Sequence, residues 1–97
     1  MVFNWDNDKN ERLKCEWGVS FERVVFLIQH GLILDILEHP SKERYKEQKL
    51  YIINIDNYAY VVPFVDEGNE RFLKAIFPSR KYTQIYLKKM GENDDAR

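Results

Sequence analysis

Basic and aromatic side chains gather near the C-terminal end of the sequence in a pattern that suits RNA. The cluster consists of Lys74, Arg80, Lys81, Tyr82, Tyr86, Lys88 and Lys89. Lysine and arginine contact phosphates, while tyrosine rings stack on unpaired bases. The pattern favours an RNA-binding surface. The alternative is an ordinary amphipathic helix whose Ile85 faces the core and whose lysines face water.

A histidine lies beside a second basic segment. His39 ends a predicted strand and precedes a charged loop that contains Arg44 and Tyr45. Because imidazole is the usual proton carrier near neutral pH, His39 is a candidate for acid–base catalysis, and Arg44 for phosphate contact. A purely structural histidine is the alternative. His30 is interpreted as a capping or surface residue near a helix end.

The motifs of several large enzyme classes are missing from the sequence. It contains no glycine-rich phosphate loop, no paired-histidine metal spacing and no Gly-x-Ser-x-Gly. Cys15 is the only cysteine, so a cysteine-based metal site is excluded. We therefore expect neither a metal nor a cofactor.

Composition indicates a small cytoplasmic domain with local rather than global basic character. The 97 residues carry a net charge of −1 and can bury one core, which we assign to residues 1–90. Residues 91–97 form a polar tail of net charge −2 that we expect to be unfolded. The lone cysteine fits a reducing compartment, and no apolar run approaches the roughly 18 residues of a membrane span.

The capping residues and hydrophobic periodicity predict an α+β fold that positions these side chains. Asp6 and Ser20 are good N-caps for two N-terminal helices, and Phe21, Val24 and Ile28 follow helical periodicity. We predict helices over 6–16 and 21–31, strands over 33–38, 50–56, 58–66 and 71–77, and a C-terminal helix over 80–90. The prediction is a four-stranded, mainly antiparallel sheet with all helices on one face.

Turn residues refine this prediction. Asp56-Asn57 suits a tight hairpin, and residues 40–48 are too polar to be buried. Pro63 lacks an amide donor, so its strand must lie at an edge there or carry a bulge. Pro78 should end the last strand, and Gly91 the last helix.

Two blocks resemble the BrnT-like toxins of the RelE superfamily. Phe3-x-Trp5-Asp6-x-x-Lys9, followed by Gly-Val-Ser-Phe-Glu over residues 18–22, is similar to the opening of that family. Arg80 and Thr83 correspond to the arginine and threonine before its last helix. The chain departs from the family at Glu16-Trp17, where the family has Lys-His, at Leu13, where it has asparagine, and at Tyr82, where it has alanine.

The resemblance implies a RelE-like fold and an endoribonuclease that inhibits translation. It also implies inhibition by a cognate antitoxin, encoded beside the toxin, that carries the DNA-binding part and represses its own operon. The partners expected are this antitoxin, in a heterotetramer or larger complex, and an RNA substrate, with no membrane.

Metal-independent cleavage of RNA needs a base, an acid and a cationic stabiliser of the phosphorane. Arg80 is the first candidate for the stabiliser, and Lys74 and Arg44 are the second. His39, Glu38 or Tyr82 could move protons, and the sequence does not rank them. Two alternatives stay open: a RelE-like binding module without catalytic activity, and an interaction subunit that uses its aromatic-rich sheet.

Overall fold

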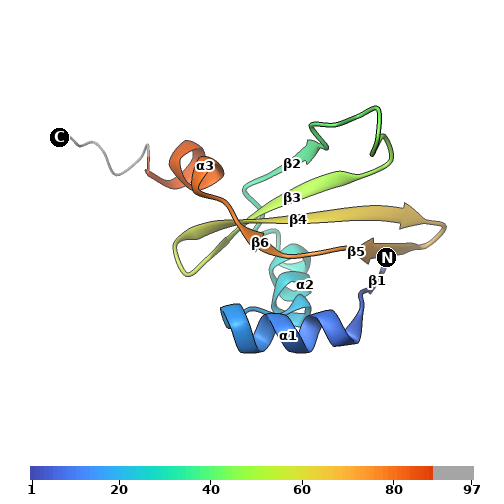
Figure 1. The fold of residues 1–97 in the computed structure, drawn as a ribbon, viewed down its shortest axis with the longest axis horizontal. Coiled ribbons are helices and arrows are strands. Elements are labelled where there is room, and N and C mark those ends of the chain that lie inside the picture. The colour runs from blue at the N-terminus through green and yellow to red at the C-terminus, as the bar shows by residue number, and fades with distance from the viewer. Residues whose placement is uncertain (89–97) are drawn as a thin grey trace.

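The computed structural model describes residues 1–88, which form an α+β fold around one mixed sheet (Figure 1). The elements are β1 (Val2–Asn4), α1 (Asn7–Trp17), α2 (Phe21–Gln29), β2 (Asp35–Glu38), β3 (Lys49–Ile55), β4 (Tyr58–Glu67), β5 (Glu70–Leu73), β6 (Phe77–Pro78), α3 (Arg80–Thr83) and the π-helical segment η1 (Gln84–Lys88). The strand order is β1-β5-β4-β3-β2, and β6 also pairs with β4. The sheet thus has six strands, and the prediction of four was wrong.

The two N-terminal helices begin where their capping residues predict. The Asp6 carboxylate accepts hydrogen bonds from the amides of Asp8 and Lys9, and the Ser20 hydroxyl accepts one from the amide of Arg23. These side chains satisfy amides that have no partner within the helix. Gly18 ends α1 at a φ of 70°, a conformation that glycine adopts without a Cβ clash.

The β3–β4 hairpin turns at the predicted dipeptide. Asp56 and Asn57 both have positive φ, 53° and 69°, as a two-residue turn of type I′ requires. The register runs from Ile55 opposite Tyr58 to Lys49 opposite Phe64. Local turn chemistry therefore sets the pairing of the two longest strands.

Pro63 explains why the strand predicted over 71–77 is split. Its carbonyl accepts a hydrogen bond from the Lys74 amide at 2.8 Å, so its nitrogen faces the same neighbour. That nitrogen carries no hydrogen, and the ladder breaks there. On this side β4 pairs with β5 from Phe64 onward and with β6 at Tyr60 and Val61. The expected edge at Pro63 is therefore a local gap in the pairing of β4. Pro78 was expected to end the strand over 71–77, but it belongs to β6.

The sequence analysis missed β1. This three-residue strand runs parallel to β5, with Val2 opposite Glu70 and Asn4 opposite Phe72. A strand this short carries no measurable periodicity, and its partner lies at the other end of the chain. Only tertiary pairing reveals it.

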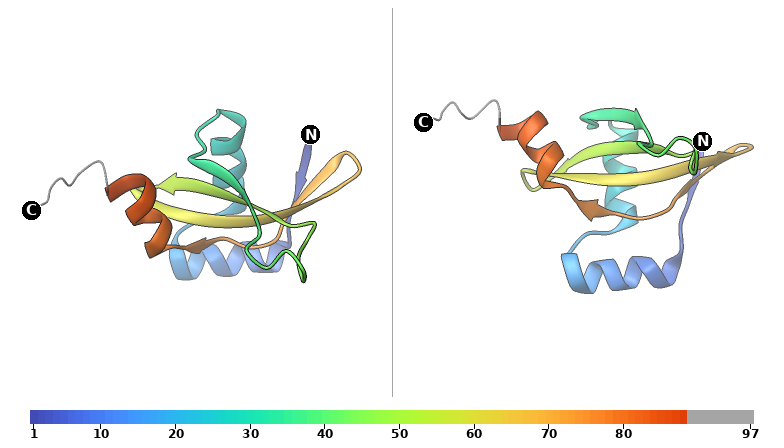
Figure 2. Two further views of the ribbon diagram at one scale, coloured as in Figure 1. Left: turned by 90° about the horizontal axis from the view of Figure 1, so that it is seen from above. Right: turned by 45° about the horizontal axis from the view of Figure 1, so that its top comes forward.

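The helices cover both faces of the sheet, contrary to the expectation of one. Leu13, Phe21 and Val24 from α1 and α2 pack with Tyr51, Ile53 and Val62. On the opposite face, Leu50, Ile52, Ala59 and Val61 pack with Tyr82, Tyr86 and Leu87 from the C-terminal segment. Figure 1 shows α3 across the sheet from α1 and α2, and Figure 2 shows the same arrangement from two further sides. The alternation of β3 decides this, because successive buried side chains point to opposite faces.

A buried amide joins the first two helices. The Asn10 side chain accepts a hydrogen bond from the Phe21 amide at 2.8 Å and donates one to Glu22 at 2.9 Å. The bond from Asn10 lowers the pKa of Glu22. Asn10 therefore satisfies an amide at the start of α2 that has no partner within the helix.

None of the helices in residues 1–88 is long and apolar enough to cross a bilayer.

Candidate functional site

A cleft of about 380 Å³ lies between the end of β2 and the start of α3, on the face opposite α1 and α2. Its lining consists of His39, Pro40, Leu50, Val61, Pro63, Phe77, Ser79, Lys81 and Tyr82. Four stretches of the chain thus meet there: the end of β2, β3, β4 and the segment from β6 to α3. The volume is near the lower end of the range of about 300–1,000 Å³ that is usual for small-molecule sites.

The floor of the cleft is apolar and its polar groups stand at the walls. Leu50 and Val61 are buried side chains of β3 and β4, and Phe77 is exposed. His39 follows β2, and Lys81 and Tyr82 belong to α3. An apolar floor with a few polar groups beside it can hold the flat face of a base while contacting its phosphate.

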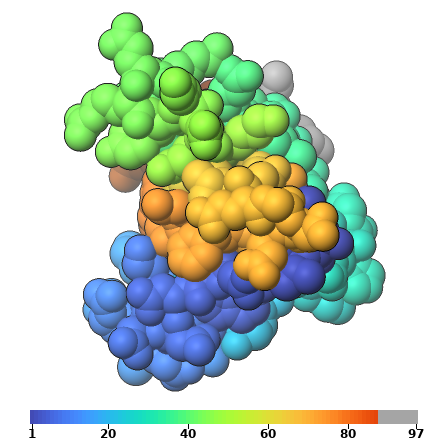
Figure 3. All heavy atoms as spheres, turned by 90° about the vertical axis from the view of Figure 1, so that its right-hand side faces the viewer, coloured from blue at the N-terminus to red at the C-terminus, as the bar shows by residue number. Residues whose placement is uncertain are grey.

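His39 is held by its own loop. Its Nδ1 accepts a hydrogen bond from the Ser41 amide at 3.0 Å, so the neutral imidazole carries its proton on Nε2. The ring packs on Tyr45, with ring centres 4.5 Å apart, and the Arg44 guanidinium lies 5.5 Å from the Tyr45 ring centre. The loop that carries these residues stands out from the surface (green in Figure 3). The structure therefore links His39 to Arg44 through Tyr45.

The start of α3 is anchored to β4. The Ser79 amide donates to the Ala59 carbonyl at 2.9 Å, and the Ala59 amide donates to the Thr83 hydroxyl at 2.8 Å. The Thr83 hydroxyl in turn donates to the Ser79 carbonyl. Thr83 is buried, so this closed set of hydrogen bonds places Lys81 and Tyr82 at the cleft.

Lys81 and Tyr82 lie together on the cleft wall. The Lys81 ammonium lies 5.4 Å from the centre of the Tyr82 ring, within the range of a cation–π contact. Lys81 is exposed, and within residues 1–88 it forms no ion pair. Its charge is therefore available to an external anion.

Lys74 does not line the cleft, but it lies on the same face of the sheet. Its amide hydrogen bond to Pro63 extends the β4–β5 register by one residue beyond Leu73 opposite Phe64. Residues opposite each other in a sheet share a face, so Lys74 shares the face of Pro63, which lines the cleft. Lys74 is exposed.

Arg80, the first candidate for a phosphate contact, does not line the cleft. It lines a separate hollow of about 310 Å³ together with Tyr58, Thr83 and Gln84. Glu38 is also absent from the cleft lining and pairs with Lys42 at 2.6 Å. The hydrogen bond from Lys42 lowers the pKa of Glu38, which makes this carboxylate a weaker base.

The remaining predicted residues have other surroundings. Tyr86 lies 6.1 Å from Tyr82 between ring centres, and its hydroxyl donates to the Asp35 carboxylate at 2.6 Å. This bond ties η1 to β2. The Lys88 side chain and all of Lys89 lie outside the described residues, as do the helix end expected at Gly91 and the tail 91–97. His30 caps α2, with Nδ1 2.8 Å from the Phe26 carbonyl, in agreement with its structural interpretation.

We expect Tyr86→Phe to destabilise the fold by about 1–3 kcal/mol at neutral pH, because it removes a hydrogen bond to a charged acceptor. The pKa of Tyr86 is raised from 10.0 to about 12. The hydrogen bond to Asp35 is the largest cause, and burial is the second. A tyrosine whose pKa is raised by folding contributes stability below pH 10 and loses it as the pH rises through about 12. Denaturant unfolding at increasing pH should show wild type and Tyr86→Phe converging over this interval. A difference that stays constant with pH would contradict the assignment.

Sequence reasoning missed Ser41 and Tyr45 as supports of His39, and Tyr58 and Gln84 as neighbours of Arg80. The polar composition of residues 40–48 marks the surface loop in which Ser41 and Tyr45 lie beside His39, and it was the available signal for these two residues. Nothing in the sequence connects Tyr58 to Arg80. Within residues 1–88, no group of three or more His, Cys, Asp or Glu side chains is arranged to hold a metal.

Comparison of the chain with protein-family models, with functionally characterised proteins and with solved structures finds no significant match.

Proposed function

We propose that this protein cleaves RNA without a metal and is the toxin of a type II toxin–antitoxin pair. The observation that carries the proposal is the cleft in which His39, Lys81 and Tyr82 meet over an apolar floor. The resemblance of residues 3–22 and 76–83 to BrnT-like toxins adds to it. The near-neutral net charge of the chain does not oppose RNA binding, because Lys81 and Lys74 place positive charge on the face of the sheet that carries the cleft.

The proposed reaction is transesterification within the RNA backbone. The 2′-hydroxyl loses its proton to a base and attacks the adjacent phosphorus, while the bond to the 5′-oxygen of the next nucleotide breaks. That oxygen takes up a proton, which leaves a cyclic phosphate and a 5′-hydroxyl. His39 and Tyr82 are the groups in the cleft that can exchange protons, and Lys81 offsets the charge that develops on the phosphate.

The arrangement of His39 assigns it a specific first contact. With Nδ1 occupied by the Ser41 amide, Nε2–H donates a hydrogen bond to a phosphate oxygen. Arg44, whose guanidinium lies 5.5 Å from the Tyr45 ring centre, supplies a second cation for the RNA backbone. The cytoplasm is the compartment we propose, since RNA and the partner protein meet there.

The test is induction of the chain alone in bacterial cells, beside His39→Ala and His30→Ala. His30 is the matched control, because it is the other histidine and lies at the end of α2. We expect growth arrest and RNA cleavage with wild type and His30→Ala, and neither with His39→Ala at equal soluble level. Co-expression of the neighbouring gene should relieve the arrest, and purified protein should cleave RNA in EDTA.

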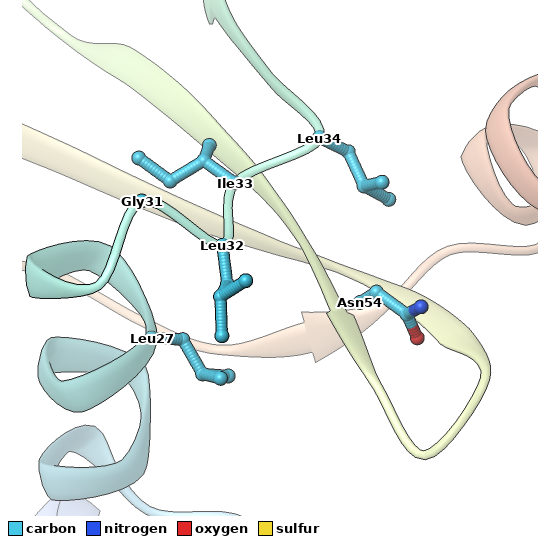
Figure 4. A pocket seen from close by; sticks show the side chains of 6 residues that line it. All are labelled: Leu27, Gly31, Leu32, Ile33, Leu34 and Asn54. Carbon is cyan, nitrogen blue, oxygen red and sulfur yellow. The ribbon is translucent and has the colours of Figure 1, made fainter.

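A second candidate function is a binding module that keeps the fold without catalysis. It is favoured by an apolar hollow of about 350 Å³ lined by Leu27, Gly31, Leu32, Ile33, Leu34 and Asn54. Figure 4 shows the side chain of Leu32 extending toward Leu27 at the end of α2. Phe26, Leu32 and Ile36 are exposed large apolar side chains. Healthy cells with intact RNA after induction would favour this reading over the ribonuclease.

A further inference from the structure

We propose that the hollow lined by Tyr58, Arg80, Thr83 and Gln84 is a second RNA subsite, which binds the nucleotide next to the one in the cleft. The inference rests on the proposed function and assigns Arg80 to binding of the flanking phosphate instead of to the reacting one. The ligand is one phosphate with its base in single-stranded RNA.

The hollow offers the groups that such a nucleotide needs. Arg80 is exposed and forms no ion pair within the described part of the chain, so its guanidinium is free to hold phosphate oxygens in pairs. Tyr58 presents an aromatic ring for stacking, and the exposed Gln84 amide both donates and accepts hydrogen bonds. The lining thus matches a phosphate, a base face and a base edge.

The walls of this hollow are held in place. The Tyr58 ring meets Tyr60 edge-on, with centres 6.1 Å apart and planes at 72°. Thr83 is buried and bonded to Ala59, the neighbour of Tyr58 in β4. The same bonds that place α3 against β4 therefore place Arg80 beside Tyr58.

The two hollows adjoin through consecutive residues. Arg80 lines one and Lys81 lines the other, and their Cα atoms are about 3.8 Å apart. Ser79 lines the cleft, while its amide is bonded to Ala59 next to Tyr58. A strand of RNA that contacts Lys81 with one phosphate passes this turn of the chain and reaches Arg80 with a neighbouring one.

The experiment compares the binding of a dinucleotide, whose single phosphate occupies the cleft alone, with that of an oligoribonucleotide of about ten nucleotides, a usual site size for single strands. We expect Arg80→Ala and Tyr58→Ala each to weaken binding of the longer RNA by about tenfold and to leave binding of the dinucleotide unchanged. Arg80→Ala should also reduce the slope of log affinity against log salt by about 0.7, the value for one phosphate contact on a single strand. Arg80→Lys should restore the slope but only part of the affinity.

The control is Arg12→Ala, an exposed arginine on α1 whose loss changes the net charge equally. Equal thermal midpoints of all variants would show that the fold is kept. An equal loss for both RNA lengths with Arg80→Ala would overturn the inference and return Arg80 to the reacting phosphate, with the ribonuclease proposal intact. No loss for the longer RNA would overturn the subsite alone. Wild-type protein that binds neither RNA would overturn both proposals.

Discussion

Lys81→Ala is expected to lower the rate of RNA cleavage by about 10²–10³-fold, the scale for loss of one group that stabilises developing charge. Lys81 is the cation that lines the cleft beside His39, and its ammonium forms no ion pair in the described residues. Single-turnover cleavage of a dinucleotide, which has one phosphate, measures this step without the contribution of longer RNA.

The matched control for this prediction is Lys14→Ala. Lys14 lies on α1, across the sheet from the cleft, and its pairing with Glu11 is exposed and contributes little stability. Lys81→Arg should retain part of the rate because it keeps the charge. Cleavage by Lys81→Ala at the rate of Lys14→Ala would exclude Lys81 from the reaction.

Thr83→Val is expected to lower the free energy of unfolding by about 1–3 kcal/mol and to weaken RNA binding with it. Valine has the shape of threonine but cannot accept the hydrogen bond from the Ala59 amide, which would be left buried without a partner. Its effect reaches the site because Thr83 joins the start of α3 to β4. Urea unfolding and RNA titration of the same samples measure the two losses.

Thr83→Ser separates the hydroxyl from the methyl group. Serine can keep both hydrogen bonds, to Ala59 and to the Ser79 carbonyl, and should retain most of the RNA affinity. If Thr83→Val and Thr83→Ser lost equal affinity, the bonded hydroxyl would not be what positions Lys81 and Tyr82.

Local features of the fold could be predicted from short stretches of sequence. Asp6 and Ser20 mark the starts of α1 and α2, and Asp56-Asn57 marks the turn between β3 and β4. Asp6 and Ser20 accept hydrogen bonds from backbone amides within three residues, and Asp56 and Asn57 tolerate the positive φ that the turn requires. Such interactions are written in neighbouring residues, so the sequence is sufficient to find them.

Elements that depend on distant partners were misjudged. The prediction for 71–77 ignored that Pro63 would interrupt its pairing, and Val2–Asn4 became a strand only because β5 lies beside it. The face that α3 covers follows from the Ser79–Ala59 and Thr83–Ala59 bonds, which join residues about one quarter of the chain apart. No periodicity within the helix reports on such a contact.

The sequence by itself determined which side chains could serve an RNA-directed chemistry: a histidine after a strand, and a run of cations and tyrosines at the C-terminal end. Only the tertiary structure decided which of them meet. It placed His39, Lys81 and Tyr82 in the lining of one cleft, and Arg80 and Tyr58 in the lining of another hollow. The reason is that adjacent residues at the start of α3 leave the backbone in different directions, and the docking of that turn on β4 assigns each direction to a different hollow.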